Sequence, residues 1–356
     1  MKKTALLMAG GRGERFGPAS RMNLPKQFLS LTGDGKTMIQ MTVERIRNVV
    51  ATEDIYIATN KNYWNLIREQ LPDIPEENIL CEPVGRNTAP CIGFGAVHIA
   101  QKYGDALMLV LPSDHLIKYT SIFCQTIDDA CSVAEKEDKL VTIGITPDEP
   151  ETGYGYIKFI PNQMIGRAFA VERFVEKPDL ETAKNYLASH EYLWNSGMFI
   201  WKTSTVLESL KHYLPDLSAG LERIRMSLGS PEEEEVLQRE FYGFKSVSID
   251  YGVMEKASNI YCLAGNFGWD DVGSWLAVGR IRKTNEQGNV ISGNVVAVET
   301  RNAIIQGKEK LIAAVGLKDI VVVDTDDAIL ICDKDSCGDV KMVLEKLRNN
   351  NKSQYL

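Results

Sequence analysis

The sequence lacks the long apolar runs, paired cysteines and basic excess that mark three common classes of protein. No stretch approaches the roughly 18 apolar residues of a membrane span. None of the seven cysteines stands in a C-x-x-C pair, so neither a zinc ribbon nor a redox dithiol is indicated. Lys and Arg number 40 against 48 Asp and Glu, and the net charge of −8 is not the basic field that nonspecific nucleic-acid binding uses. Any bound anion therefore has to be held by a local cluster of positive groups.

The start of the chain and the odd number of cysteines favour a reducing compartment. Only six or seven apolar residues follow Met1-Lys2-Lys3 before the first glycines, which is too few for a secretory signal. We therefore expect reduced thiols in a cytoplasmic protein, with no membrane and no nucleic acid among its partners.

Length and composition indicate a globular protein of about two domains. The chain has 356 residues, of which 44% are hydrophobic and 25% charged. A chain of this length can bury a large core without disulfides or structural metals.

The first part of the chain alternates apolar runs with amphipathic segments. We expect strands at Thr4–Ala9, Ile55–Thr59, Ala106–Leu111 and Leu140–Ile145. We expect helices at Thr37–Val50, Asn62–Leu71, Ala89–Tyr103 and Phe123–Glu137. This alternation predicts a mostly parallel sheet covered on both faces, whose ligands sit beyond the carboxyl ends of the strands.

The pattern changes twice along the chain. The middle reads as strands at Gly153–Ile160 and Ala168–Val175, with helices at Leu180–Ser189 and Thr203–Tyr213. Past Thr284, five short β-runs follow with little helix between them: Gly293–Glu299, Ala303–Gln306, Leu311–Val315, Ile320–Asp324 and Ala328–Cys332. We predict a larger α/β domain over 1–285 and a β-rich domain over 286–356, either a solenoid or a half-barrel.

A glycine-rich loop follows the first predicted strand. Such a loop can wrap backbone N–H groups around phosphate. A dinucleotide-binding loop would need a small residue where Phe16 stands, and a Walker A loop would need glycine where Ser30 stands. What remains is a loop with its own cations, Arg12 and Arg15, followed by Pro25-Lys26, which together suit a triphosphate.

Residues 8–28, MAGGRGERFGPASRMNLPKQF, resemble the opening of the sugar-nucleotide pyrophosphorylases, and more narrowly of the mannose-1-phosphate guanylyltransferases. Phe16, Gly17 and Ala19 replace the family's usual Leu, Trp and Leu, changes that affect loop packing more than the phosphate ligands. Seven further blocks follow in the family's order: Glu82–Pro90, Leu111–His115, Thr152–Ile157, Phe174–Pro178, Trp194–Phe199, Ser248–Lys256 and Trp269–Trp275.

The resemblance implies both a fold and a reaction. The fold is a Rossmann-like, mixed and mostly parallel α/β nucleotidyltransferase domain of the GT-A-like kind, with a small C-terminal domain like a left-handed β-helix that packs in a homodimer. The reaction is in-line attack of α-D-mannose 1-phosphate on the α-phosphorus of GTP, assisted by Mg²⁺, giving GDP-mannose and pyrophosphate. About seventy residues after the catalytic part are too few for the isomerase domain of many relatives, so isomerase activity is not expected. Two alternatives stay open: the same chemistry with another sugar 1-phosphate or nucleotide, and a catalytically silent regulatory protein that binds sugar nucleotides.

The resemblance also implies the nucleotide and metal residues. The expected nucleotide-binding residues are Ala9, Gly10, Gly11, Gly13, Arg15, Lys26, Glu82, Asn87, Thr88, Pro112, Ser113 and Asp114. The expected catalytic residues are Arg15, Lys26, Asp114 and Asp271, and the metal ligands are Asp114 and Asp271 rather than Asp270. The Glu82 carboxylate could accept hydrogen bonds from guanine N1–H and N2–H₂, an edge that adenine cannot offer. Alternatively, Glu82 caps the following helix or pairs with Arg86.

The expected residues of the sugar-phosphate site are Tyr154, Gly155, Glu176, Lys177, Asn195 and Ser196. In the family, the glutamate of the Glu-Lys pair contacts sugar hydroxyls and the lysine contacts the sugar phosphate. An isolated Glu-Lys pair would ordinarily be a surface ion pair of little value. Asn195 can donate and accept at once, which suits a hydroxyl group. Asp250 and Glu255 are plausible pocket groups without an assigned role.

Overall fold

The computed structural model describes residues 1–11 and 13–356, so the expected cation Arg12 lies outside the described residues. The chain forms two compact units. Unit 1 comprises Met1–Gly10, Val43–Ser113 and Ile117–Trp269, and unit 2 comprises Gly11–Thr42, Asp114–Leu116 and Asp270–Leu356. The division predicted from the sequence, between residues 285 and 286, stays a prediction.

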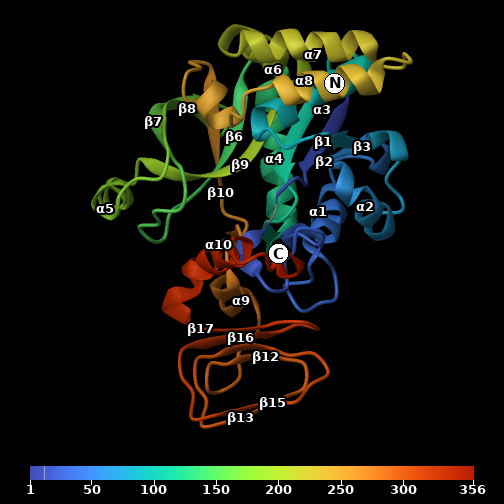
Figure 1. Ribbon diagram of the computed structural model, residues 1–356. Helices are drawn as coiled ribbons and strands as arrows, with labels where there is room; N and C mark the ends of the chain where they lie inside the picture. Colours follow the sequence, from blue (N-terminus) through green and yellow to red (C-terminus); the bar gives the residue numbers. More distant parts are fainter. Residues whose placement is uncertain (12) are drawn as a thin grey trace. The chain divides into compact units, whose positions relative to one another are not determined.

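Unit 1 is built on a sheet of nine strands among the described residues, in the order β3-β2-β1-β4-β9-β6-β10-β8-β7 (Figure 1). Their bounds are β1 Lys3–Met8, β2 Ile55–Asn60, β3 Ile79–Glu82, β4 Leu107–Pro112, β6 Leu140–Ile145, β7 Tyr156–Ile165, β8 Ala168–Val175, β9 Tyr192–Lys202 and β10 Ile260–Gly265. Parallel pairing joins β3, β2, β1 and β4, and also β6 with β10. Strand β9 enters antiparallel between β4 and β6, and β7 pairs antiparallel with β8, which makes the sheet mixed.

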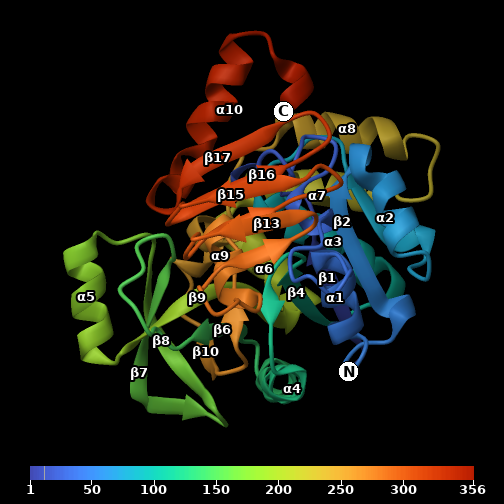
Figure 2. The ribbon, with the colours of Figure 1, turned by 90° about the horizontal axis from the view of Figure 1, so that it is seen from below.

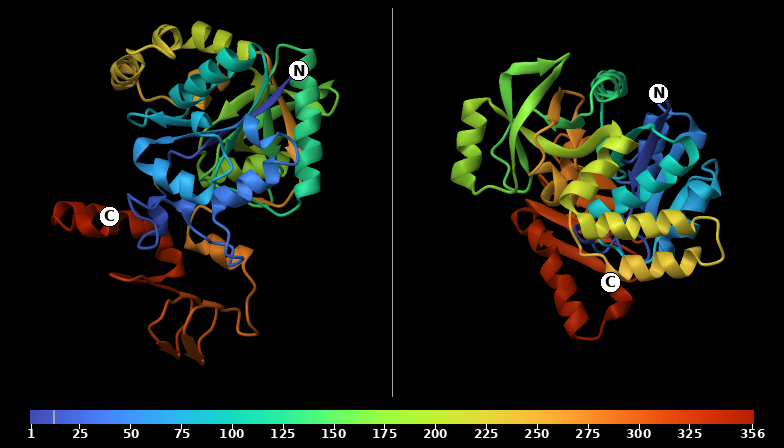
Figure 3. Two further views of the ribbon diagram at one scale, coloured as in Figure 1. Left: turned by 90° about the vertical axis from the view of Figure 1, so that its right-hand side faces the viewer. Right: turned by 90° about the horizontal axis from the view of Figure 1, so that it is seen from above.

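Helices cover both faces of this sheet, as the alternating pattern predicts. The helices of unit 1 are α2 Trp64–Gln70, α3 Thr88–Tyr103, α4 Thr120–Lys136, α5 Leu180–Ser189, α6 Thr203–Tyr213, α7 Pro215–Ser227 and α8 Glu233–Gly243. Helices α3, α6, α7 and α8 pack together over one part of the sheet, as Figure 3 shows. Successive β1 residues Ala5, Leu6 and Leu7 are all buried although they point to opposite faces.

Strand β9 was not expected from the sequence. Its Asn195-Ser196-Gly197 stretch interrupts the apolar run that would have predicted a strand. The register against β6 shifts between Thr142 and Gly144, which is a bulge. Bulges re-aim side chains and are frequent next to functional sites. The β7 strand also differs from the expectation, because it begins at Tyr156 and leaves residues 152–155 as a loop.

Unit 2 contains a short coil of parallel strands, seen in Figure 2. The strands are β12 Val290–Ser292, β13 Val295–Val298, β14 Ile304–Gln306, β15 Ile312–Val315, β16 Ile320–Asp324 and β17 Ile329–Asp333. Strands β12, β14 and β16 stack in parallel, and β13 pairs with β15 in the same way, so successive turns of chain lie on one another. This arrangement confirms the expected β-rich domain. Strand β17 closes the stack antiparallel to β16.

The rest of unit 2 consists of short helices around a second apolar core. These are η1 Glu14–Phe16, η2 Lys26–Phe28, α9 Trp275–Ile281, η7 Lys334–Asp339, α10 Val340–Asn349 and η8 Ser353–Tyr355. Phe16 and Trp275 meet in the core with ring centroids 5.2 Å apart. Helix α1 (Met38–Ile46) and strands β5 (Leu116–Ile117) and β11 (Trp269–Asp270) span the points where the chain passes between the units. Among the described residues, no helix has the length and apolar character to cross a membrane.

Candidate active site

The glycine-rich loop needs a glycine at position 13, because the backbone there has φ +60°, a conformation that other residues rarely adopt. A Cβ atom there would lie 2.3 Å from Lys26 Cβ and 2.7 Å from Lys26 N. The loop therefore lies directly against the start of η2, and Pro25 gives that turn its extended lead-in. Gly13 and Lys26, which were each predicted to bind the nucleotide, are therefore in contact.

Lys26 is buried and contacts both predicted metal ligands, Asp114 and Asp271. Its Nζ lies 2.9 Å from Asp114 Oδ2 and donates a 2.6 Å hydrogen bond to the backbone oxygen of Asp271. Burial alone would raise the pKa of Asp114, but Lys26 and then His115 hold that pKa below its ordinary value. Asp114 is therefore ionised at neutral pH.

These residues line a hollow of about 530 Å³ that lies within unit 2. Its lining is Gly13, Glu14, Arg15, Phe16, Lys26, Asp114, His115, Asp271, Gly273 and Lys341. The four expected catalytic residues thus share one hollow. Cations and carboxylates together at such a place can hold phosphate groups and a hard metal ion.

The structure also separates Asp271 from its neighbour Asp270. The Asp270 carboxylate accepts hydrogen bonds from Arg280 at 2.9 and 3.0 Å and from Val272 N at 2.8 Å. Asp271 lines the hollow, and a Cβ atom on Gly273 would lie 2.7 Å from Asp271 Oδ2. The missing side chain at Gly273 leaves room for the Asp271 carboxylate.

Glu82, at the end of β3 in unit 1, is a buried carboxyl group that can accept a further hydrogen bond. Its side chain is 5% exposed, and its buried Oε1 has no hydrogen-bond partner among the described residues. Burial raises the pKa of Glu82 to about 7. Gly10, another predicted nucleotide residue, lies close by, since a Cβ atom on it would be 3.5 Å from Glu82 Oε2.

The two structural roles considered for Glu82 are taken by other groups. Helix α3 is capped by Asn87, whose Oδ1 accepts from Thr88 N at 2.8 Å. Arg86 donates instead to the backbone oxygens of Phe241 and Tyr242 at 2.9 and 2.7 Å. These contacts leave Glu82 available to a ligand.

The ends of β1 and β4 present the other predicted nucleotide residues. Met8 pairs with Pro112 across the two strands, and Ser113 Oγ donates to Met8 O at 2.8 Å. Ala9 continues β1, with its N–H bonded to Ala58 O at 2.7 Å. Gly11 is an exposed residue of unit 2, one position beyond Gly10.

Three of the predicted sugar residues meet in unit 1. A Cβ atom on Gly155 would lie 2.7 Å from Glu176 Oε1 and 3.5 Å from Asn195 Cβ, so both side chains lie against Gly155. Asn195 N donates to Gly155 O at 2.8 Å. Ser196 differs, because it is 2% exposed and donates to Ile143 O at 2.6 Å.

Aromatic rings and one cation surround these residues. Tyr154 packs edge-on against both Trp194 and Trp269, with ring centroids 5.2 Å apart in each case. Lys177 is 67% exposed with φ +39°, and its Nζ lies 3.6 Å from Glu176 Oε2. Its ammonium group can therefore reach a ligand from solvent.

Sequence reasoning gave no role to Asp250, which the structure places beside Asn195. Asn195 Nδ2 donates to Asp250 Oδ1 at 2.7 Å. Asp250 begins a π-helix, η6 (Asp250–Met254). Single π-turns are rare and often mark functional sites, but no simple sequence signal announces them.

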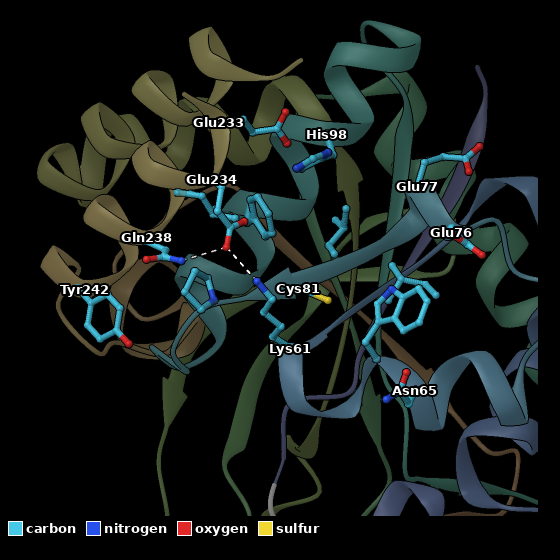
Figure 4. A pocket seen from close by; sticks show the side chains of 16 residues that line it. Lys61, Asn65, Glu76, Glu77, Cys81, His98, Glu233, Glu234, Gln238 and Tyr242 are labelled. Atoms are coloured by element: carbon cyan, nitrogen blue, oxygen red, sulfur yellow. Dashed lines mark hydrogen bonds and ion pairs between the residues drawn. The ribbon is translucent and has the colours of Figure 1, made fainter. Parts of the chain in front are cut away.

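A separate hollow of about 640 Å³ lies beside strand β3 and helix α8 (Figure 4). Lys61 and Gln238 both reach Glu234 at its rim, at 3.0 Å each. His98 lines it from α3, and burial lowers the pKa of His98 to about 4. None of the residues predicted for the nucleotide, sugar or metal lines this hollow.

Comparison with known proteins places this chain among nucleotide-transferring enzymes. The profile described as "Nucleotidyl transferase" matches residues 4–288. The profile described as "MannoseP isomerase/GMP-like beta-helix domain" matches residues 293–347.

Individual proteins resemble the chain over nearly its whole length. A mannose-1-phosphate guanylyltransferase of Salmonella montevideo is 41% identical over 364 residues, covering 99% of this chain and 75% of that protein. A protein with the same name from Escherichia coli (strain K12) is 41% identical over 360 residues, covering 98% of this chain and 74% of that protein. A crystal structure named mannose-1-phosphate geranyltransferase, from Thermus thermophilus, superposes with a TM-score of 0.88 at 35% identity, covering 98% of this chain and all of the other.

Proposed function

Since the chain belongs to the nucleotidyl transferase family, among the mannose-1-phosphate guanylyltransferases, we propose how its residues make GDP-mannose and pyrophosphate from GTP and α-D-mannose 1-phosphate. The observation that carries the mechanism is the hollow in which Lys26, Asp114 and Asp271 meet. Both substrates are anions, so the physical task is to neutralise charge and to align the attacking oxygen with the α-phosphorus. No covalent intermediate with the protein is needed.

In our proposal the cations of the hollow hold the leaving pyrophosphate. Lys26 is buried beside Gly13, and Arg15 lines the same hollow from η1. Amides of Gly11 and Gly13 add neutral donors. A fixed ammonium and a planar guanidinium make charge-assisted hydrogen bonds with phosphate oxygens, which are stronger than neutral ones. They favour the transition state because negative charge grows on the leaving group.

The nucleotidyl transferase family generally uses a divalent metal ion, and we propose that the ion here is Mg²⁺. The donor set fits, because Asp114 is held ionised and Gly273 leaves space at the Asp271 carboxylate. No group of three or more metal-binding side chains occurs in the described part of the chain. Asp114 and Asp271 would hold the ion together with substrate phosphates, since Mg²⁺ is usually bound by one or two carboxylates and phosphate oxygens. When bound, the ion would neutralise charge on the phosphates.

Glu82 is proposed to read the base. Its two carboxylate oxygens would accept the two guanine donors, N1–H and N2–H₂, and one of these oxygens, Oε1, has no hydrogen-bond partner among the described residues. Two hydrogen bonds hold the segment after Glu82 in place: Thr88 N donates to Asn87 Oδ1, and Ile249 N donates to Thr88 Oγ1.

Glu176 and Asn195 are proposed to bind sugar hydroxyls, and Lys177 the sugar phosphate. Gly155 allows Glu176 to lie close to the backbone, and Tyr154 forms an aromatic wall with Trp194. Ser196 would support β9 through its bond to Ile143 O.

We also propose a cytoplasmic homodimer. The dimer is supported by apolar side chains exposed on the strand coil of unit 2 and on β17: Val296, Val298, Leu311, Val315, Ile329 and Ile331. Groups of exposed apolar side chains are common at protein interfaces. The location is supported by seven cysteines that are all free.

A substrate panel tests the proposal. Pyrophosphate release is measured with GTP, ATP, UTP and CTP, each combined with mannose 1-phosphate or glucose 1-phosphate, with and without Mg²⁺. The proposal expects the highest kcat/KM for GTP with mannose 1-phosphate and no release without metal. A higher value for another pair would reassign the substrate, and no release with any pair would favour a silent binding protein.

A further inference from the structure

The carboxamide of Asn195 makes a hydrogen bond at each end, one through its nitrogen and one through its oxygen. Its Nδ2 donates to Asp250 Oδ1 at 2.7 Å, and its Oδ1 accepts from Gly197 N at 3.1 Å. A backbone N–H can only donate and a carboxylate can only accept, so these two partners define which end of the amide is nitrogen. Rotating the amide by 180° would lose both hydrogen bonds.

We infer that Asp250 is a positioning residue for the sugar: it holds the Asn195 carboxamide in one orientation, so that the amide offers one free N–H and one free oxygen lone pair to a sugar hydroxyl. A hydroxyl group both donates and accepts, which matches this pair. The inference rests on the proposed function, because it takes the residues around Asn195 to be the sugar site.

The surroundings of Asn195 are arranged for such a role. Asn195 lies beside the bulge in β9, and its N–H is bonded to Gly155 O at 2.8 Å. Glu176 occupies the space that a side chain on Gly155 would fill. The amide is thus fixed by the backbone on one side and by Asp250 on the other, next to a second carboxylate that can accept from the same sugar.

Asp250 is itself held by its turn. The preceding residue, Ile249, is fully buried and donates from its N–H to Thr88 Oγ1 at 2.8 Å. Glu255 N donates to Asp250 O at 2.9 Å, which closes the π-turn. The carboxylate therefore sits on a short, well-anchored segment, and Thr88 links that segment to the nucleotide block.

Asp250 lies near charges of both signs. Burial is the largest effect and raises the pKa of Asp250, and the hydrogen bond from Asn195 is the next largest and lowers it. Of the nearby charges, Glu176 raises this pKa, whereas Lys177 lowers it. Burial raises the pKa of Glu255 as well, and Glu176 and Asp250 raise it further. Repelling carboxylates in one pocket cost stability, and that cost is consistent with a functional reason for keeping them together.

The test is a double-mutant cycle on the intact chain. Asp250→Ala should raise KM for mannose 1-phosphate about tenfold, the size expected for a lost hydrogen bond to a charged group, while KM for GTP stays within about twofold. On the Asn195→Ala background the same change should raise KM for the sugar phosphate by less than about twofold, because there is no amide left to position. Asp250→Asn retains an acceptor oxygen and should recover most of the loss.

Two further variants keep the test decisive. Asp250→Leu, similar in size, replaces Asp250→Ala if the alanine variant does not fold. Ser248→Ala is the matched control, because it removes the acceptor of Tyr251 N at 3.2 Å in the same turn without touching Asp250 or Asn195. It should leave KM for the sugar phosphate within about twofold of the wild-type value.

Equal effects of Asp250→Ala on the wild-type and Asn195→Ala backgrounds would overturn the inference. So would an equal rise in both Michaelis constants. A wild-type chain that releases no pyrophosphate with any substrate pair is a different outcome, since it would refute the proposed function itself.

Discussion

Lys26 Nζ lies 2.9 Å from Asp114 Oδ2, so a buried ammonium and a partly exposed carboxylate form an ion pair in the lining of the hollow in unit 2. Isolated buried ion pairs seldom stabilise a fold, because desolvation offsets their attraction. The arrangement is consistent with the proposed roles, in which Lys26 holds the departing pyrophosphate and Asp114 binds the metal ion.

The two neighbouring aspartates should differ in function. Asp271→Asn is expected to lower kcat/KM about 100-fold, which corresponds to about 3 kcal/mol of lost metal-assisted stabilisation, while GTP binding falls less. Asp270→Asn should change the rate less, and should instead lower the melting temperature, because Arg280 loses a charged partner. Steady-state kinetics and thermal unfolding of both variants measure this. An inactive Asp270→Asn with an active Asp271→Asn would show that the assignment is one residue off.

Lys177 should act on one substrate only. Replacing it with Met removes an exposed ammonium expected to contact the sugar phosphate, worth about 1.5–3 kcal/mol for a charge-assisted contact. KM for mannose 1-phosphate should rise roughly 10- to 100-fold, and KM for GTP should change little. Lys184→Met, on the nearby helix α5, serves as the control. Equal losses for both substrates would place Lys177 elsewhere.

Glu82 should make base discrimination depend on pH. Its pKa is raised to about 7, so the carboxylate gains a proton as the pH falls through 7 and then cannot accept both guanine donors. The ratio of kcat/KM for GTP to that for ATP should therefore fall between pH 8 and pH 6 in the wild type. In Glu82→Gln the ratio should be lower and independent of pH. If the variant keeps the wild-type ratio at pH 8, backbone groups read the base instead.

His98 should make stability fall in acid. In the folded chain burial lowers its pKa to about 4, whereas in the unfolded chain it titrates near 6.5. The unfolded state therefore binds the extra proton first, and stability present above pH 6.5 is lost as the pH falls toward 4, by on the order of 3 kcal/mol. Urea unfolding of wild type and His98→Gln across this range measures the effect. Equal pH slopes for the two proteins would contradict it.

Continuous patterns in the sequence predicted much of the fold. Leu140–Ile145 and Ala168–Val175 are strands with the expected bounds, and Leu180–Ser189 and Thr203–Tyr213 are helices with the expected bounds. Strand β9 was not predicted because Asn195-Ser196-Gly197 breaks its apolar run. Its antiparallel place in the sheet is set by pairing between segments that are distant in the sequence, which no local pattern shows.

The candidate site likewise has parts that the sequence could predict and parts that it could not. Blocks of adjacent residues, such as the one containing Asp271, could be recognised from the sequence. The contact between Asn195 and Asp250 could not, because the residues lie 55 positions apart and meet only through a bulge and a π-turn. Likewise the contact of Gly13 with Lys26 depends on how the loop folds back.

The transfer of labelled phosphate tests the central claim most directly. GTP labelled at its α-phosphate or at its β-phosphate is incubated with mannose 1-phosphate and Mg²⁺, and the products are separated. The account predicts that the α-label appears in GDP-mannose and the β-label in pyrophosphate, with no label in free inorganic phosphate. An α-label that remains in GDP or GMP, or a β-label that enters the sugar nucleotide, would contradict nucleotidyl transfer to the sugar phosphate.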